Sequence, residues 1–392
     1  MVERAKGGYR ASEPQPVTYV ELFFDLVFVF AVTQLTALTA HDLTPGGILR
    51  SILLGWLIWW AWTQFTWTLN PADTMHPTVR VVTLAATAVA LVMSASVPQA
   101  FTTDALWFAL PYVIVRVLGL GLQVRVELER VGENHGGVYR WATFSAIGLL
   151  LVLLGAVADP GIRPWIWLLA IVADLVAAAM AGRGAVWDMD PAHLSERHGA
   201  FVIIAIGESL IIAGTAVANA ERSVALEAAA AGAILVASLL WWTYFGWLKE
   251  ALEEAYALVP PERNGNVARD AFSLAHFPLI AGIVGFAVAL EGIGTHPDEP
   301  MSVAILASLG VGVALFVGSS ALSLRLAGGP LLIPRLAILG LMLAAVVVLA
   351  SLQLPPVWPL LVVAAALFAI VLTEGAGPET EHVPQAAGIR SD

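Results

Sequence analysis

Long apolar runs separated by short polar breaks dominate this chain of 392 residues. A bilayer core of about 30 Å needs about 20 predominantly apolar residues per crossing helix. Turn-forming clusters such as Thr44-Pro45-Gly46-Gly47 and Asp159-Pro160-Gly161 interrupt the runs. The pattern predicts twelve spanning helices in an all-α polytopic membrane protein, at residues 17–38, 47–68, 78–97, 105–126, 139–158, 163–182, 198–218, 226–248, 270–291, 301–322, 333–351 and 356–373.

The composition supports this class and excludes others. Hydrophobic residues make up 59% of the chain and charged residues 12%, against about 45–50% and about 25% in soluble domains. So few charges cannot cover a soluble globule of this length. The net charge is −11, and the only lysines are Lys6 and Lys249, so no basic stripe suits nucleic acid. The absence of cysteine excludes disulfides, thiolate metal sites and a thiol nucleophile.

The distribution of arginine and lysine predicts the orientation, because short loops rich in these residues stay in the cytoplasm. With the N-terminus inside, only Arg50, Arg163 and Arg222 lie outside, and Arg116 lies within a span. The inner ends and loops then hold Arg4, Lys6, Arg10, Arg80, Arg125, Arg130, Arg140, Arg183, Arg197, Lys249, Arg263, Arg269, Arg325, Arg335 and Arg390. We therefore expect both termini in the cytoplasm and a multi-pass protein in the bilayer of the plasma or inner membrane.

Recurring features predict an internal duplication of six plus six helices. Similar residues recur in the same order, at offsets of 182 to 195 residues. The matches are Trp59-Trp60 with Trp241-Trp242, Arg80 with Arg269, Arg140 with Arg335, and Pro164-Trp165 with Pro356-Val357-Trp358. Because six is even, the halves would be parallel repeats, an arrangement that places transporter sites near the midplane between them.

The same pattern gives five segments. We expect a disordered cytoplasmic tail (1–16), a first half (17–182), an amphipathic cytoplasmic linker (183–197), a second half (198–373) and a polar cytoplasmic tail (374–392). In the linker, Asp190 followed by Pro191 indicates the start of a short helix.

Ionisable residues inside the spans are the candidate site. A charge at the bilayer centre costs about 2.5–3.5 kcal/mol on insertion scales, so each requires a pairing partner or a function. The candidates for a substrate or ion pathway are Glu21, Asp25, Arg116, Asp174, Glu208 and His276.

Two of these carboxylates occupy equivalent places if the halves are duplicated. Asp25 precedes Trp60 by 35 residues, and Glu208 precedes Trp242 by 34. We expect both at similar depth in a central cleft, where they would suit proton or cation coupling, with Glu21 one turn nearer the cytoplasm. The alternative is a structural role, in which span 1 is fixed to a neighbour through Arg116 or Arg80.

The other candidates also have two interpretations. Arg116 and Asp174 lie at similar depth, which favours an internal ion pair over binding of an anionic substrate. His276 precedes Pro278, which breaks the local hydrogen-bond ladder, so it marks either a transport site or a contact between helices.

The segment before span 7 carries three further polar side chains. Glu196 and Arg197 are either inner-end contacts or parts of a gate, since Arg197 lies about three turns before Glu208. His193 and Glu196 are three apart, but no second ligand pair accompanies them, so no metal or other cofactor is expected. The chain has neither a nucleophile elbow nor a phosphate loop, and enzyme activity is not expected.

Two segments resemble signature motifs of the bacterial low temperature requirement protein A family: TYVELFFDLVFVFA at 18–31 and ERHGAFVIIAIGESL at 196–210. The run His276-Phe277-Pro278-Leu279 is similar to a third. The resemblance extends from about residue 16 to about 373 and implies a multi-pass membrane protein, without assigning a substrate. The motif positions that match are Glu21, Phe24, Asp25, Glu196, Arg197, Gly207, Glu208 and His276.

Together these observations predict a secondary transporter or permease with a carboxylate site near the midplane. One alternative is a membrane or stress-adaptation protein without transport activity, in which the buried charges are structural. A second, an intramembrane enzyme acting on lipid, is disfavoured by the lack of catalytic motifs.

Overall fold

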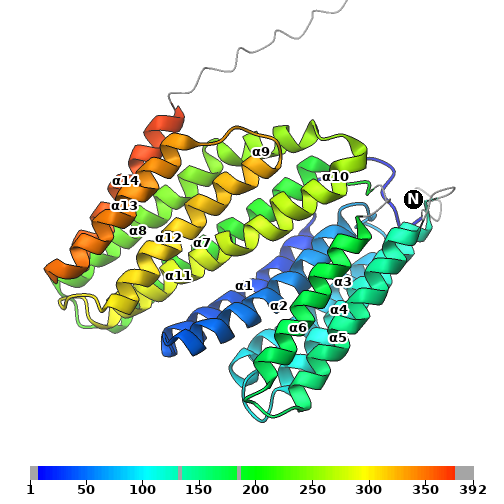
Figure 1. Cartoon of the computed structure of the whole chain (residues 1–392), viewed down its shortest axis with the longest axis horizontal. Helices are drawn as coiled ribbons and strands as arrows, with labels where there is room; N and C mark the ends of the chain where they lie inside the picture. The colour runs from blue at the N-terminus through cyan, green and yellow to red at the C-terminus, as the bar shows by residue number, and fades with distance from the viewer. Residues whose placement is uncertain (1–7, 131–134, 183–186, 376–392) are drawn as a thin grey trace, which may run out of the picture.

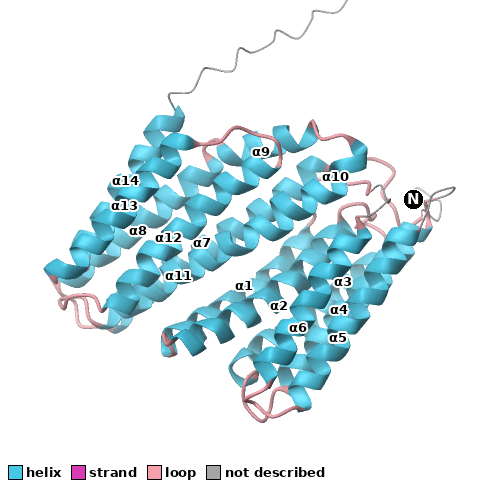
Figure 2. Cartoon of the chain, in the orientation of Figure 1, coloured by secondary structure: helices cyan, strands magenta, loops and turns pink. Residues whose placement is uncertain are grey.

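The computed structural model describes residues 8–130, 135–182 and 187–375 (Figure 1). Within these ranges the regular structure is helical, and the β-structure is a single isolated bridge between Arg10 and Ala72 (Figure 2). The predicted all-α fold is confirmed.

The helices form two blocks that lie side by side (Figure 1). The first block contains α1 (Tyr19–His41), α2 (Pro45–Leu69), α3 (Pro77–Ala95), the short 3₁₀ helix η1 (Val97–Gln99), α4 (Leu106–Leu128), α5 (Gly136–Val157) and α6 (Arg163–Ala181). The second contains α7 (Pro191–Asn219), α8 (Val224–Phe245), α9 (Leu248–Ala257), α10 (Pro261–Val267), the π-helix η2 (Ala268–Leu274), α11 (Ala275–Thr295), α12 (Val303–Leu326), α13 (Ile333–Leu352) and α14 (Val357–Gly375).

Eleven stretches of the described chain are long and apolar enough to cross a membrane, and α2 is not among them. The twelve spans expected from the sequence therefore become eleven by this measure, although α2 has 25 residues. Its interior-facing side chains explain the difference, because it buries tryptophan, threonine and glutamine against α1, α4, α6, α7 and α11. A helix surrounded by protein has less need of an apolar surface than one that faces lipid.

The two blocks use the same pairwise contacts. In the first block the packed pairs are α1–α2, α1–α3, α3–α4, α4–α5, α5–α6 and α6–α2. In the second block the corresponding pairs are α7–α8, α7–α11, α11–α12, α12–α13, α13–α14 and α14–α8. This is the pattern that a duplication would produce, and the duplication itself stays a prediction. Contacts between the blocks run mainly from α1 and α2 to α7 and α11.

Two segments expected to be separate from the bundle are part of it. Residues 8–16 were predicted to be disordered, but Asp73 donates to the Tyr9 carbonyl at 2.7 Å and the Arg10 guanidinium lies 2.6 Å from Asp188. The predicted linker is also different, because its residues from Pro191 onward form the first turns of α7 rather than a separate surface helix. Residues 1–7, 183–186 and 376–392, which carry Arg4, Lys6, Arg183 and Arg390, lie outside the described residues.

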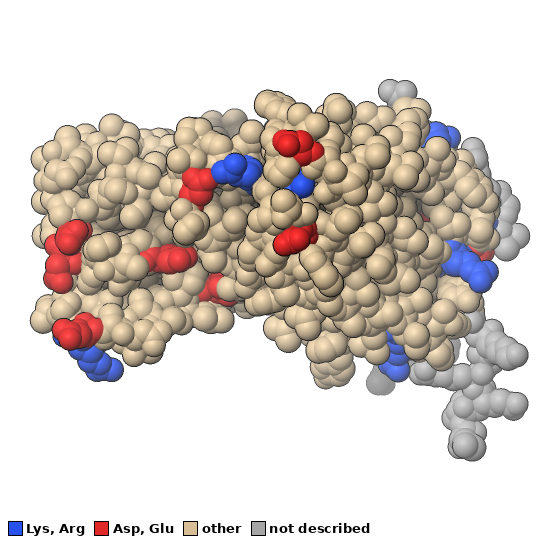
Figure 3. Space-filling model, turned by 90° about the horizontal axis from the view of Figure 1, so that it is seen from below, with Lys and Arg blue, Asp and Glu red and all other residues tan. Residues whose placement is uncertain are grey.

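One end of the bundle carries α9, α10 and the described beginning of the chain, and α14 also ends there (Figure 1). The opposite end contains the α1–α2 and α11–α12 connections. The view onto this opposite end is largely uncharged, with scattered acidic and basic groups (Figure 3). We call the first the α9 end and the second the connection end.

Candidate functional site

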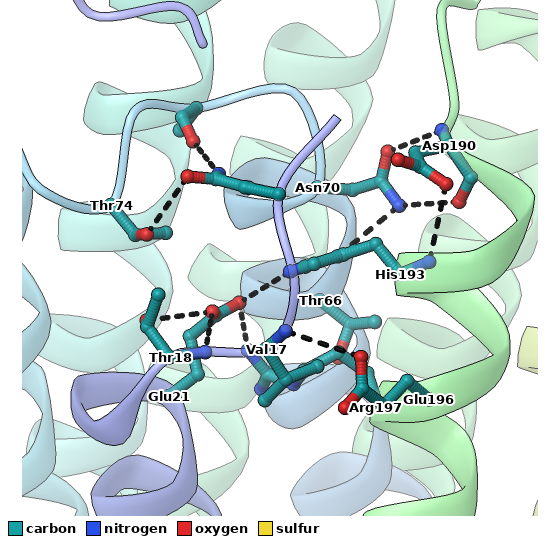
Figure 4. A network of polar contacts seen from close by, with 12 residues as sticks. Val17, Thr18, Glu21, Thr66, Asn70, Thr74, Asp190, His193, Glu196 and Arg197 are labelled. Carbon is teal, nitrogen blue, oxygen red and sulfur yellow. Dashed lines mark hydrogen bonds and ion pairs between the residues drawn. The ribbon is translucent and has the colours of Figure 1, made fainter. Parts of the chain in front are cut away.

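Four buried side chains form a polar network between α1 and α7, near the α9 end. Figure 4 shows three of them, Glu21, His193 and Arg197. Arg197 lies 2.8 Å from Glu21 through Nη1 and 2.7 Å from Asp25 through Nη2. His193 Nε2 lies 3.1 Å from the same Glu21 oxygen that contacts Arg197. We call Glu21, Asp25, His193 and Arg197 the α1–α7 ion network.

Helical spacing brings these four side chains together. Glu21 and Asp25 are four residues apart on α1, and His193 and Arg197 are four apart on α7, so each pair lies on one helix face. Glu21 also accepts bonds from the Thr18 backbone at 2.9 Å and hydroxyl at 2.8 Å. One carboxylate thus helps to cap the start of α1 and binds α7 as well.

The start of α7 is fixed to the end of α2. Asp190 caps α7 by accepting from the Ala192 and His193 backbone N–H groups. The Asn70 amide donates to the Asp190 carbonyl at 3.0 Å and accepts from its N–H at 2.8 Å. Because α2 and α7 belong to different blocks, this pair holds the blocks together beside the ion network.

The network is fully withdrawn from the surface. Glu21, Asp25 and Arg197 are each 0% exposed, and His193 is 1% exposed. The Trp62 indole donates to Asp25 at 2.7 Å, while its ring lies 5.8 Å from the Arg197 guanidinium carbon. Two carboxyls share one guanidinium, so the charges balance only when a carboxyl or His193 carries an additional proton.

Aromatic rings separate this network from the middle of the molecule. Phe201 contacts Trp62 and Trp59, with ring centroids 4.6 and 5.4 Å apart, and His198 contacts Trp62 at 5.1 Å. We call Trp59, Trp62, His198 and Phe201 the aromatic layer. It comes from α2 and α7, where His198 directly follows Arg197 and Phe201 lies about one turn further along the helix.

His276 adjoins this layer and is held by two hydrogen bonds. Its Nδ1 donates to the Ala271 carbonyl at 3.0 Å, and its Nε2 accepts from the Tyr244 hydroxyl at 2.8 Å. Ala271 belongs to η2, the π-helical turn that precedes α11, so the ladder is rearranged before Pro278 as well as by it. His276 therefore lies in α11 directly after a π-helical turn and before Pro278, in a helical stretch that continues without a gap, and its role remains a prediction.

A cavity of about 490 Å³ lies beyond the aromatic layer, between α1 and α2 of one block and α11 and α12 of the other. Trp59, Phe201, Phe277 and Pro278 line its inner part, and Leu43, Ile48 and Ala304 line the part toward the connection end. The volume is in the range of about 300–1,000 Å³ that is usual for ligand pockets. The polar groups in its lining are few: Thr39, Ser51, Trp59 and Ser308.

This cavity faces outward through exposed side chains. Ile52 on α2 is 48% exposed, and Val311 on α12 is 53% exposed. The walls are thus apolar, and part of them lies on the outer side of the helix bundle. This setting suits an apolar or amphipathic molecule better than an inorganic ion.

Arg116 and Asp174 form a second buried pair inside the first block. Arg116 Nη2 lies 3.0 Å from Asp174, and Nη1 donates to the Tyr112 hydroxyl at 3.0 Å. The geometry is that of the ion pair favoured from the sequence, and it leaves the guanidinium enclosed between α4 and α6.

Glu208 does not join Asp25. Its carboxyl interacts with the Thr33 hydroxyl, eight residues beyond Asp25 on α1, or about 12 Å along the helix. The expectation of two carboxylates at one depth is therefore wrong, because α1 and α7 run alongside each other and Arg197 already occupies the level of Asp25. The partner of Glu21 and Asp25 is Arg197, rather than Arg116 or Arg80.

The remaining predicted contact is Glu196, which accepts a bond from the Val17 N–H at 3.2 Å (Figure 4). His193 therefore contacts Glu21 in the first turn of α1, whereas Glu196 binds the backbone just before α1 begins. Among the described residues no group of three or more histidine, aspartate or glutamate side chains could hold a metal ion.

Sequence reasoning missed the roles of Trp62, Asn70 and His193. The Thr18-x-x-Glu21 spacing is a capping-box signal and could have shown that Glu21 caps α1. No local signal connects Trp62 or Asn70 with this site, because their partners lie 37 and 120 residues away.

The comparison with known protein families decides the identity. Residues 16–372 match the family described as bacterial low temperature requirement A protein (LtrA). This chain belongs to the LtrA family. The LtrA-family chain is also 26% identical over 291 residues to the uncharacterized protein RA0937 of Rhizobium meliloti (strain 1021), covering 72% of this chain and 70% of that protein. No solved structure matches it.

The family match covers all four members of the α1–α7 ion network and every predicted site residue. Two of the three signature segments, around Glu21–Asp25 and around Arg197, meet each other in the folded LtrA chain. The third, at His276, lies 5.0 Å from His198 by ring centroids.

Proposed function

We propose that this LtrA-family protein is a secondary transporter of the plasma or inner membrane that carries an apolar or amphipathic solute. One observation carries the proposal: a cavity between the two blocks ends at the aromatic layer on the side of the α9 end, and the α1–α7 ion network behind this layer joins the blocks. Cavities between repeats with one side closed are typical of alternating-access transporters.

In this proposal the ion network is the gate. It links α1 of the first block to α7 of the second, and opening it would separate the blocks where they are now in contact. With the N-terminus in the cytoplasm, the cavity opens away from the cytoplasm and the closed side faces it. The additional proton that balances the network offers a way to couple gate opening to a proton gradient.

The exposed cavity walls indicate the solute class. Ile52, Val311 and Leu315 are at least partly exposed on the sides of the cavity, where a bilayer would surround them. A solute dissolved in the membrane could enter through this side without crossing a polar region.

The second candidate function is that of a membrane protein without transport activity. It is favoured by the direct pairing of the buried charges, because Arg197 binds both carboxylates of α1 and Arg116 binds Asp174. In this reading the network only fixes the helices, and the cavity is filled by lipid chains.

Cysteine accessibility distinguishes the two functions, and the cysteine-free chain needs no background removal. A membrane-impermeant maleimide should label Ser51→Cys, in the cavity, from the connection side. It should not label Ser238→Cys, which is exposed on α8 and serves as the lipid-facing control. Thr66→Cys, buried beside the network, should be unreactive until Arg197→Gln opens access from the α9 side.

Flux in proteoliposomes completes the test. We expect wild-type protein to accelerate the movement of at least one solute from a panel of a fatty acid, an aromatic amine and a neutral steroid, and Arg197→Gln to reduce that rate. If Thr66→Cys stays unreactive in a folded Arg197→Gln protein and no solute moves, the non-transporting function replaces the proposal.

A further inference from the structure

A smaller cavity of about 40 Å³ lies in a different part of the molecule, between α2, α4, α5, α6 and the α10–η2 segment. None of its lining residues belongs to the α1–α7 ion network, and it shares no lining residue with the large cavity. The neighbours Trp59 and Trp60 line different cavities: Trp59 lines the large one and Trp60 the small one. At about 10–15 Å³ per water, it holds about three water-sized groups. Four tryptophans line it: Trp60, Trp67, Trp141 and Trp187.

Four buried polar atoms in this lining have no hydrogen-bond partner of good geometry: Trp60 Nε1, Gln64 Oε1, Gln123 Oε1 and Trp141 Nε1. The Trp60 N–H interacts with the Asp174 carboxyl, which leaves the atoms of Gln64, Gln123 and Trp141 without a partner. Their residues are 2%, 4% and 9% exposed. The Gln64 amide nitrogen donates to the Arg116 carbonyl at 3.2 Å, which fixes the orientation of this amide and leaves its oxygen free. Unpaired buried polar atoms are costly, so three of them around one cavity indicate an occupant.

The charges around the cavity favour a neutral occupant. Arg269 is the charged residue of the lining, and the lining contains no carboxylate. A bound cation would therefore meet the Arg269 guanidinium without a compensating anion. An anion would have to compete with Asp270, which lies 2.7 Å from Arg269, and would face the negative faces of the indole rings.

The hydrogen-bonding pattern indicates the chemical class. Two acceptor oxygens and one donor N–H are complementary to a molecule with two N–H groups and one carbonyl oxygen. A flat molecule of this kind also fits against indole rings. We propose that this cavity, which we call the four-tryptophan pocket, binds a small neutral solute of the primary-amide or urea type. The proposal does not depend on the transport function, because it uses other residues.

Equilibrium dialysis with radiolabelled acetamide tests this assignment on the full chain in lipid nanodiscs. We expect saturable binding close to one molecule per chain. Gln64→Leu and Gln123→Leu keep the side-chain size but remove the acceptor, and each should weaken binding at least about tenfold. Gln34→Leu, a half-buried glutamine on α1 outside the pocket, should bind as the wild type does.

Trp141→Phe keeps an aromatic wall but removes the N–H donor together with one of the two fused rings, so it tests the pocket if a glutamine variant fails to fold. It should also weaken binding at least about tenfold. Methylammonium, of similar size but charged, should not bind measurably. The proposal is overturned if folded wild-type protein shows no saturable acetamide binding, if methylammonium binds as well as acetamide, or if the folded pocket variants bind like the wild type.

Discussion

At the scale of single residues, Arg197 is the side chain on which the candidate site depends. It is completely buried, and its two terminal nitrogens contact different carboxylates of α1. Replacing it leaves Glu21 and Asp25 close together and without a cation. Removing one partner of a buried ion pair costs about 3–5 kcal/mol, whereas exposed pairs are worth about 0–1 kcal/mol.

We therefore predict that Arg197→Gln destabilises the folded protein by about 3–5 kcal/mol. Thermal unfolding in detergent, followed by circular dichroism, would measure the change. Arg222→Gln is the matched control, because Arg222 is 79% exposed and lies 3.7 Å from Glu227. Equal effects of the two substitutions would show that the buried network contributes no more than a surface pair.

At the scale of helices, the closest packing is between α11 and α12. A Cβ atom at Gly312 would lie 2.8 Å from the Gly282 carbonyl oxygen, and one at Gly282 would lie 2.5 Å from the Gly312 carbonyl oxygen. Backbone cannot yield as a flexible side chain can, so any larger residue forces these helices apart. Small residues at such contacts are typical of helix pairs in membranes.

Gly312→Ala should accordingly destabilise the protein by about 1–3 kcal/mol, the usual cost of overpacking. Gly340→Ala on α13 is the control, since no atom lies within 4 Å of its Cβ position and alanine is the better helix former. Chemical denaturation of both variants gives the comparison. A stabilised Gly312→Ala protein would mean that α11 and α12 are not packed at this distance.

The helices themselves could largely be predicted from the sequence, because each lipid-facing helix needs its own long apolar run. A helix start at Asp190 and Pro191 was also predicted from their local capping signal, but as a separate short helix and not as the first turn of α7. The pairing of the charges could not be read in the same way. Asp25 and Arg197 are 172 residues apart, and nothing near either of them indicates the other. The equal spacing of Asp25 and Glu208 from tryptophans suggested one shared depth, but the side-by-side packing of α1 and α7 separates them.

At the scale of the whole molecule, the orientation in the membrane decides which side the cavity faces. The excess of arginine at one end predicts that this end is cytoplasmic. The same assignment places the α1–α7 ion network near the cytoplasm and the large cavity on the other side. This remains a prediction from the sequence.

Reporter fusions test this orientation directly. Fusions after Arg140 and Arg269 should be active only as cytoplasmic reporters, and fusions near Asp104, Arg222 and Asp298 only as external ones. If two or more fusions lay on the side opposite to the predicted one, both the twelve crossings and the parallel repeat would be contradicted. Such a result would also reverse the side from which Ser51→Cys is expected to react.

The unusual composition of α2 has a consequence for how the protein is made. A segment enters the bilayer during synthesis according to its own apolarity, and α2 falls below the level that the other eleven stretches reach. Its favourable surroundings exist only once α4, α6, α7 and α11 are present, and these follow it along the chain. We therefore expect the nascent α1–α2 hairpin to depend on later helices for stable insertion. Synthesis of this protein would then pass through a stage in which its most enclosed helix is the one held least firmly in the membrane.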